Sequence, residues 1–268
     1  MSGYGMKFGL LPCALMGAAV LLGPTRAHAD EITGSGAAVL TQIAASDSWG
    51  FADAELKAQA VVREKDGKSR TVRFSAQSRY YEGTLTKSLV RFLAPPDLNG
   101  VKFLQIQKRD TDDERYIYLP EFKRVRRVSG KLRAGSFMTT DFAFADLDRR
   151  ELRFAEATTL PDEKVGDTVC NRLTLKPTSS DAQYSRLEVW ARKDNHMILK
   201  SQMYDLKGAH SKTFTVEESK QIQGRWFVTR SRMESHTAQR ATTLVLEHVA
   251  PRKDFPDNLF DSRRLEQE

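Results

Sequence analysis

The sequence predicts a mainly β protein, built as an antiparallel sheet that meanders and curls. Three observations predict this fold: apolar and polar residues alternate through many short runs, turn-forming residues separate the runs, and helix signals are few. Alternation with a period of two is typical of strands that bury one face and leave the other in water. A large curled sheet has a concave face, which side chains or a ligand must fill.

The clearest hairpin is predicted near the start of the sheet. Apolar and polar positions alternate from 56 to 63, Asp66-Gly67 supplies a turn, and the alternation resumes at Val72. Other runs predict strands at 85–93, 101–107, 116–119, 168–175, 185–192, 197–204, 214–217, 225–232 and 242–249. Two short helices are predicted, at 37–45 and 140–147, and the Thr140 hydroxyl is placed to cap the second.

The first 29 residues have the pattern of a cleaved signal peptide. Lys7 is the basic start, residues 8–23 are apolar, and Ala27-His28-Ala29 has the small residues that a signal peptidase requires. The alternative is a membrane anchor, but the apolar run is shorter than the roughly 20 residues that span a bilayer. We therefore expect a periplasmic protein without a lipid anchor, formed by one domain at 30–268.

Charge and cysteine content narrow the classes of partner. The formal net charge is +7, and loss of the leader lowers it to about +5. An exported, mildly basic protein meets anionic lipid or acidic proteins, so we expect no nucleic acid partner. Cys170 alone remains after cleavage, which excludes an internal disulfide, and its alternation with apolar residues indicates a packing role.

Signatures of catalysis and of metal binding are missing from the sequence. The four histidines after the leader do not have the spacing of paired metal ligands, and no nucleophile elbow or phosphate-binding glycine loop is present. The acidic stretch at 110–114 lacks the glycine and distal glutamate of a calcium loop, so we interpret it as a solvated turn. Asp146 and Asp148 are interpreted as surface charge. We expect no catalytic residue, no metal and no cofactor.

Two neighbouring segments have unusual compositions. Residues 123–133 hold six cations and no acid, which is compatible with a solvated outer face or with a contact surface for anionic lipid or an acidic protein. Residues 135–147 are rich in Phe and Met beside small residues. Such residues suit a surface that accepts flexible acyl chains, and they serve equally well as ordinary core.

These segments resemble the LolA-like outer membrane lipoprotein-sorting proteins. The matching segments are PPDLNGVKFL at 95–104, YIYLP at 116–120, RVRR at 124–127, Ser136-Phe137-Met138, Asp141-Phe142, FPDNLF at 255–260 and Arg264-Leu265. Their order and spacing match as well, so the resemblance covers nearly all of 30–268. This chain departs from the pattern at Thr139-Thr140, where the family more often has a glycine followed by a small hydroxyl residue.

The resemblance implies an unclosed, half-open antiparallel β-barrel of about eleven strands around an apolar cavity, covered by a few short helices. It also implies a non-catalytic carrier that holds acyl chains of lipoproteins or lipids between the inner and outer membranes. An inner-membrane transporter of the RND type and an outer-membrane acceptor are the expected partners. An alternative is a periplasmic sensor or adaptor that docks on a membrane protein through its basic strand.

Two sets of site residues follow from this resemblance. The expected cavity and lid residues are Phe103, Tyr116, Tyr118, Phe137, Met138 and Phe142. The expected contacts for lipid head groups or a protein partner are Lys123, Arg124, Arg126 and Arg127.

Overall fold

The computed structural model describes residues 27–46, 52–83, 85–109, 111, 113–128, 135–147, 152, 155–179 and 182–267. The predicted leader up to residue 26, and Asp110, Asp112 and Asp148 of the acidic segments, lie outside these ranges. The prediction of a cleaved leader therefore stays a prediction.

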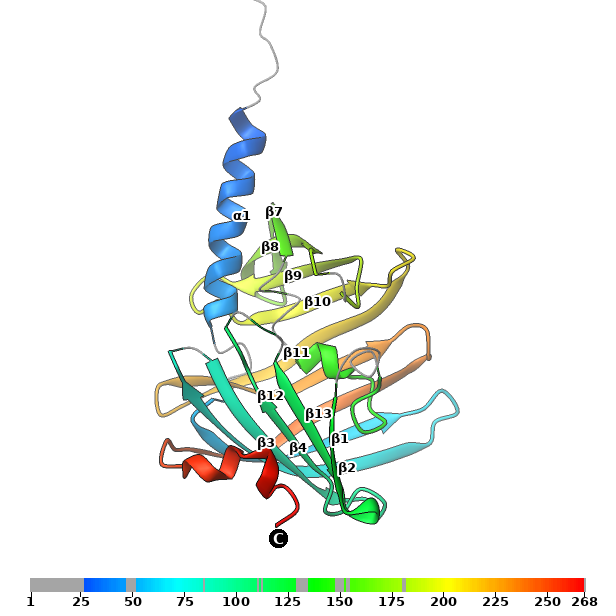
Figure 1. Cartoon of the computed structure of the whole chain (residues 1–268). Helices are drawn as coiled ribbons and strands as arrows, with labels where there is room; N and C mark the ends of the chain where they lie inside the picture. Colours follow the sequence, from blue (N-terminus) through cyan, green and yellow to red (C-terminus); the bar gives the residue numbers. More distant parts are fainter. Residues whose placement is uncertain are drawn as a thin grey trace, which may run out of the picture.

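Within these ranges, thirteen antiparallel strands form one sheet that curls around a common interior (Figure 1). The strands are β1 (Ala54–Arg63), β2 (Ser69–Tyr81), β3 (Leu85–Ala94), β4 (Lys102–Ile106), β5 (Glu114–Leu119), β6 (Arg124–Arg127), β7 (Ala155–Val165), β8 (Thr168–Pro177), β9 (Arg186–Arg192), β10 (Ile198–Tyr204), β11 (His210–Ile222), β12 (Arg225–Ser235) and β13 (Arg240–Pro251). Their order is β6-β5-β4-β3-β2-β1-β13-β12-β11-β10-β9-β8-β7. Among the described strands, β6 and β7 are the two edges, so the barrel is not closed.

The predicted fold class is confirmed, but the count of about eleven strands is wrong. The basic segment contributes the edge strand β6, and β7 lies where no strand was predicted. The β7 sequence contains Pro161 and a run of charged residues, and its burial does not alternate regularly. Proline has no N–H to donate to a neighbouring strand and occurs mostly in edge strands. Because Pro161 and the charged residues interrupt the alternation of apolar and polar residues, the sequence of β7 did not indicate a strand.

The predicted hairpin is confirmed as β1 and β2. Arg63 pairs with Ser69, and the loop between them is closed by a hydrogen bond of 2.8 Å from the Glu64 N–H to the Lys68 carbonyl. Gly67 has a φ of 84°, a left-handed conformation that glycine adopts without steric cost.

The first predicted helix is present and longer than expected. Helix α1 (Ala27–Ala45) buries Leu40 and Ile43 in the core and lies against β7. A Cβ atom at Gly36 would meet the Ala157 carbonyl oxygen at 2.6 Å, so only glycine permits this approach. Among the described residues, no helix combines the length and the apolar character needed to span a membrane.

The second predicted helix is wrong. In its place the chain forms an irregular loop that ends in one 3-10 turn, η3 (Phe144–Leu147). The Thr140 hydroxyl does not cap a helix, because it donates to the Phe137 carbonyl at 2.6 Å. The Asp146 carboxylate instead accepts from the Ala143 N–H at 2.7 Å at the start of the turn.

Apolar side chains gather on both faces of the sheet. The concave face carries the main core, which includes Phe92, Phe103 and Met233. On the convex face, the C-terminal segment with its 3-10 turns η4 (Asp257–Phe260) and η5 (Ser262–Arg264) covers β3 and β4 (Figure 1). We call this second group the convex cluster, and its buried members are Leu89, Leu104, Phe255, Phe260 and Leu265.

Candidate ligand-binding cavity

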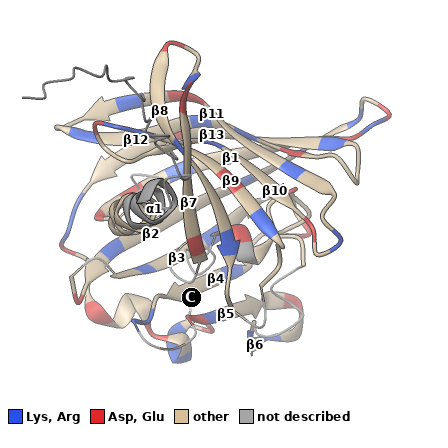
Figure 2. Cartoon of the chain, turned by 90° about the horizontal axis from the view of Figure 1, so that it is seen from above, with Lys and Arg blue, Asp and Glu red and all other residues tan. Residues whose placement is uncertain are grey.

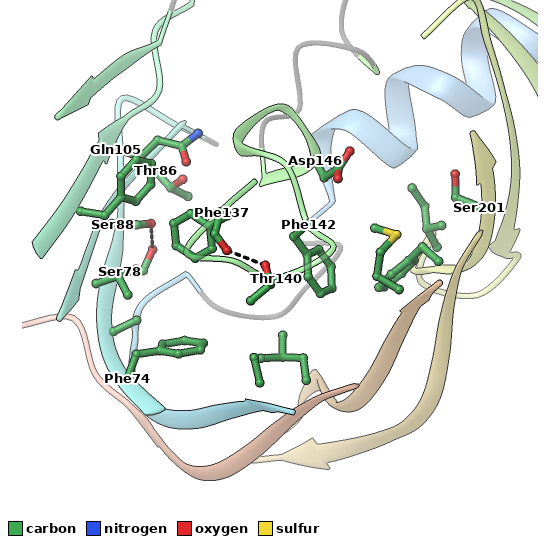
Figure 3. A pocket seen from close by; sticks show the side chains of 18 of the residues that line it. Phe74, Ser78, Thr86, Ser88, Gln105, Phe137, Thr140, Phe142, Asp146 and Ser201 are labelled. Carbon is green, nitrogen blue, oxygen red and sulfur yellow. Dashed lines mark hydrogen bonds between the residues drawn. The ribbon is translucent and has the colours of Figure 1, made fainter. Parts of the chain in front are cut away.

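A cavity of about 260 Å³ lies inside the curl of the sheet. Strands from both halves of the sheet line it, and residues 135–147, which we call the cavity loop, extend into it (Figure 3). Most of the lining is apolar and includes Leu56, Ala60, Val72, Phe74, Ala76, Val90, Phe92, Phe103, Phe137, Phe142, Leu187, Val189, Met203, Phe214, Met233 and Leu244. Such a cavity, mostly apolar with a few polar groups, is typical of sites for small hydrophobic ligands.

Aromatic contacts seat the cavity loop against the sheet. The Phe137 ring meets Phe103 edge to face, with the ring centroids 5.3 Å apart, and lies 5.5 Å from Phe92. Phe142 meets Phe214 of β11 with the centroids 6.4 Å apart. The loop therefore fills part of the concave face with its own rings and leaves the cavity beside them.

Two buried carboxylates anchor the cavity loop to the sheet. Asp141 accepts from Arg240 Nε and from the Thr242 hydroxyl, each at 2.7 Å. Asp146 pairs with Lys212 Nζ at 2.7 Å and accepts a hydrogen bond from the Tyr184 hydroxyl. Both carboxylate side chains are 1% exposed. The interpretation of Asp146 as surface charge is therefore wrong.

The backbone of the cavity loop is left-handed at Thr139, one of the two residues where this chain departs from the LolA-like sequence pattern. Met138 and Thr139 have φ angles of 50° and 64°, in the left-handed region. A β-branched residue there costs about 1–2 kcal/mol relative to glycine. Thr139 thus keeps a conformation that glycine would adopt freely, and the Arg240 guanidinium donates to its carbonyl at 3.3 Å.

One side of the cavity is polar. Ser78, Thr86, Ser88, Gln105 and Gln107, which we call the polar end, lie on or next to β2, β3 and β4 (Figure 3). The two serine hydroxyls are 2.7 Å apart and bond to each other. The sequence contained no signal for this group, because isolated Ser, Thr and Gln residues in strands are common on solvated faces.

A buried ion pair supports the polar end. Gln105 Nε2 donates to Asp113 Oδ2 at 3.3 Å, and the same oxygen lies 3.2 Å from Arg115 Nη2. The side chains of Asp113 and Arg115 are 0% and 3% exposed. The prediction that the acidic stretch is a solvated turn is therefore wrong for Asp113.

The predicted cavity residues lie in two different places. Phe103, Phe137 and Phe142 line the cavity, and Met138 packs against the main core without being part of the lining. Tyr116 and Tyr118 instead pack against the convex cluster. Tyr116 pairs with Leu104 across β5 and β4, and paired residues point to the same face of a sheet.

The predicted contact residues lie along one edge of the sheet. Lys123 follows the 3-10 turn η1 (Pro120–Phe122), and Arg124, Arg126 and Arg127 are exposed on β6. The Arg126 guanidinium lies 5.8 Å from the ring centroid of Phe122, which is 54% exposed. Basic and acidic residues are also spread over many other strands and hairpin ends (Figure 2), so β6 is one of several charged regions.

Strand pairing brings two histidines together on the outer side of the sheet. The rings of His210 and His236 are 4.3 Å apart, and the Thr213 hydroxyl lies 3.0 and 2.9 Å from their Nε2 atoms. Burial, followed by the nearby His236, lowers the pKa of His210 from its ordinary value. In the part of the chain that the structure describes, no three His, Cys, Asp or Glu side chains gather closely enough to hold a metal ion.

Cys170 is fully buried beside Trp190 and Met197, in agreement with the predicted packing role. Burial raises the pKa of its thiol.

Known proteins share this sequence pattern and this fold. A family model with the description "Uncharacterized protein" matches residues 84–267. A DUF1329 family protein from Desulfovibrio piger is 27% identical with a TM-score of 0.80, over 87% of this chain and 99% of that chain. No curated protein is similar enough to this sequence to count as a match.

Two further solved structures have the same architecture. A putative outer membrane lipoprotein-sorting protein domain from Vibrio parahaemolyticus is 27% identical with a TM-score of 0.80, over 88% of this chain and 100% of that chain. A LolA superfamily protein from Nitrosomonas europaea is 18% identical with a TM-score of 0.65, over 84% of this chain and 97% of that chain, and it shares the fold.

Proposed function

Because this chain belongs to a LolA-like family, we propose that it is a non-catalytic periplasmic carrier that holds acyl chains of a lipoprotein or lipid in its cavity. The relative from Vibrio parahaemolyticus is described as a lipoprotein-sorting domain, which agrees with this role. In this scheme an RND-type transporter in the inner membrane supplies the cargo, and an outer-membrane acceptor receives it.

The apolar cavity is the observation that carries the proposal. Protein interiors are packed as densely as organic crystals, with few voids larger than a water molecule. A cavity of about 260 Å³ among apolar side chains therefore suits a hydrophobic ligand. Each CH₂ of an acyl chain that is buried in it contributes roughly 0.8 kcal/mol. Exposing those CH₂ groups to water costs the same free energy, so an acyl chain needs a protein that shields it between the membranes.

The exposed basic edge supports a second candidate function, that of an adaptor which docks on a membrane protein. Arg124, Arg126 and Arg127 are exposed, and Phe122 beside them is an exposed aromatic ring. Arginine and aromatic residues are enriched in protein interfaces. Replacing the three arginines by glutamate tests this function: an adaptor loses its partner in a pull-down and keeps its lipid. Loss of lipid together with the partner would assign the edge to cargo transfer instead.

The carrier function is tested by the lipid content of the purified protein. Organic extraction followed by mass spectrometry should recover acyl lipid from protein isolated from the periplasm. The uncharged dye N-phenyl-1-naphthylamine should fluoresce on binding to the delipidated protein. A protein that yields no lipid and leaves the dye dark is not such a carrier.

A variant that fills the cavity localises this binding. Ala76 of β2 lines the cavity, and Ala76→Phe places a phenyl ring in it. We expect at least a tenfold loss of dye affinity with less than about 1 kcal/mol change in the free energy of unfolding, because the ring enters existing space. The matched control is Ala209→Phe, in an exposed hairpin turn, which should bind the dye normally. Equal affinity in both variants would place the dye elsewhere.

A further inference from the structure

The polar end of the cavity provides hydrogen-bonding groups that an acyl chain does not need. Ser78 lies directly across from Ser88, and Ser88 lies across from Gln105, so three polar residues form a continuous row over β2, β3 and β4. All three line the cavity in the midst of apolar residues (Figure 3). Ser78 and Ser88 bond to each other and Gln105 bonds to Asp113, so the row is stable as it stands and keeps further hydrogen-bonding capacity on the cavity side.

The polar end has both donors and acceptors left for a ligand. The Ser78 and Ser88 hydroxyls use one proton for the bond between them, which leaves the second proton to be donated. Gln105 uses its amide nitrogen toward Asp113, so its carbonyl oxygen remains as an acceptor. Gln107 has the opposite arrangement, because its carbonyl oxygen accepts from the Thr86 N–H at 3.0 Å and its amide nitrogen remains a donor.

The polar end carries no net charge. None of its five residues is ionisable, and the Asp113–Arg115 pair behind Gln105 balances its own charges. Asp146 is the one charged residue of the described lining, it lies away from the polar end (Figure 3), and it is paired with Lys212. No described residue of the cavity lining is a cation, so a carboxylate or phosphate at the polar end would be desolvated without an opposite charge in that lining, which is unfavourable.

We propose that the cavity takes a neutral amphiphile, whose uncharged hydroxyl, amide or ester group binds at the polar end while its aliphatic part lies among the Phe, Leu and Val side chains. This inference rests on the proposed carrier function and narrows its cargo. It places an uncharged polar group inside the protein, next to Ser78, Ser88 and Gln105.

The test is displacement of N-phenyl-1-naphthylamine by three ligands with the same chain length: dodecanol, laurate and dodecane. Dodecanol should displace the dye at about one tenth of the concentration that either of the others requires, because a tenfold difference corresponds to about 1.4 kcal/mol, which one added hydrogen bond can supply. Equal displacement by the three ligands overturns the inference. A wild-type protein that binds neither dye nor ligand overturns the carrier function itself, so the two failures are distinguishable.

Variants of the polar end test whether it causes the preference for dodecanol. Ser78→Ala combined with Ser88→Ala removes both hydroxyls at once and leaves neither one unpaired, so the fold should be retained. The preference for dodecanol over laurate and dodecane should fall to about twofold. Thr86→Val removes a third hydroxyl of the same end without changing the shape of the side chain, and it should lower the preference independently.

The matched control is Ser69→Ala combined with Ser219→Ala, two serines outside the cavity lining. This control should keep the full preference. A full tenfold preference in both the Ser78/Ser88 variant and Thr86→Val would overturn the proposed binding mode.

Discussion

The two apolar faces of the sheet differ in how completely they are filled. On the convex side, Phe255, Phe260 and Leu265 of the C-terminal segment pack against Leu89 and Leu104, and all five are buried. On the concave side, the cavity loop contributes Phe137 and Phe142 and still leaves about 260 Å³. The same strands β3 and β4 contribute to both faces. The C-terminal segment therefore covers its apolar face completely, whereas the cavity loop covers the concave face only in part and leaves a cavity.

Removing a ring from the filled face should have the largest effect on stability. We expect Phe260→Ala to lower the free energy of unfolding by about 4 kcal/mol, because a buried ring leaves a void in a closely packed cluster. Urea unfolding followed by circular dichroism measures this change. Dye affinity should remain that of the wild type. A large loss of dye affinity would show that the two faces are not independent.

Loosening the loop that partly fills the concave face should have a somewhat smaller effect. Asp146→Ala removes the carboxylate that pairs with Lys212, and we expect a loss of about 3 kcal/mol in urea unfolding, because the ammonium is left mostly buried without a partner. Replacing Lys212 by Met in the same chain should recover much of the loss. No recovery in the double variant would contradict the role of the charge pair.

The smallest expected effect on stability comes from His210 of β11, on the outer side of the sheet. Burial and the neighbouring His236 lower the pKa of His210 in the folded protein, so the unfolded chain takes up a proton first as the pH falls. Stability should therefore be full above the ordinary histidine pKa of about 6.5 and decrease as the pH drops through it.

Thermal unfolding between pH 8 and pH 5 measures this dependence. His210→Gln should flatten it, whereas His248→Gln, at an exposed position, should not. The same slope in wild type and His210→Gln would contradict the role of His210.

The local alternation of apolar and polar residues predicted most of the strands. For some strands, however, it did not predict which face of the sheet each side chain lies on. The hairpin of β1 and β2 was predictable because its alternation and its turn lie within 30 residues of sequence. In β4 the residues Lys102 to Gln105 are all buried, since each of its faces meets an apolar cluster. With both faces buried, alternation cannot distinguish the concave side. The resemblance placed Tyr116 and Tyr118 in the cavity, and it too carried no information on the face to which each tyrosine points.

The polar features of the site depend on contacts between distant segments, which the sequence does not show. The Asp146 side chain is buried because Lys212 and Tyr184, far along the chain, bond to it directly. The polar end exists because the register of three strands aligns Ser78, Ser88 and Gln105. The aromatic residues of the cavity loop were predictable from composition, since Phe137 and Phe142 stand out in a short segment.

The two separate edges, β6 and β7, have a consequence for the width of a ligand that the proposed carrier could hold. In a closed barrel, the number of strands and their stagger determine the radius, and a wider ligand can enter only if ladder hydrogen bonds break. In this sheet the two described edges are not bonded to each other, so no ladder hydrogen bond between them fixes the circumference. If the chain carries acyl chains as proposed, such a sheet can accept cargo of different widths while every ladder bond between neighbouring strands stays intact.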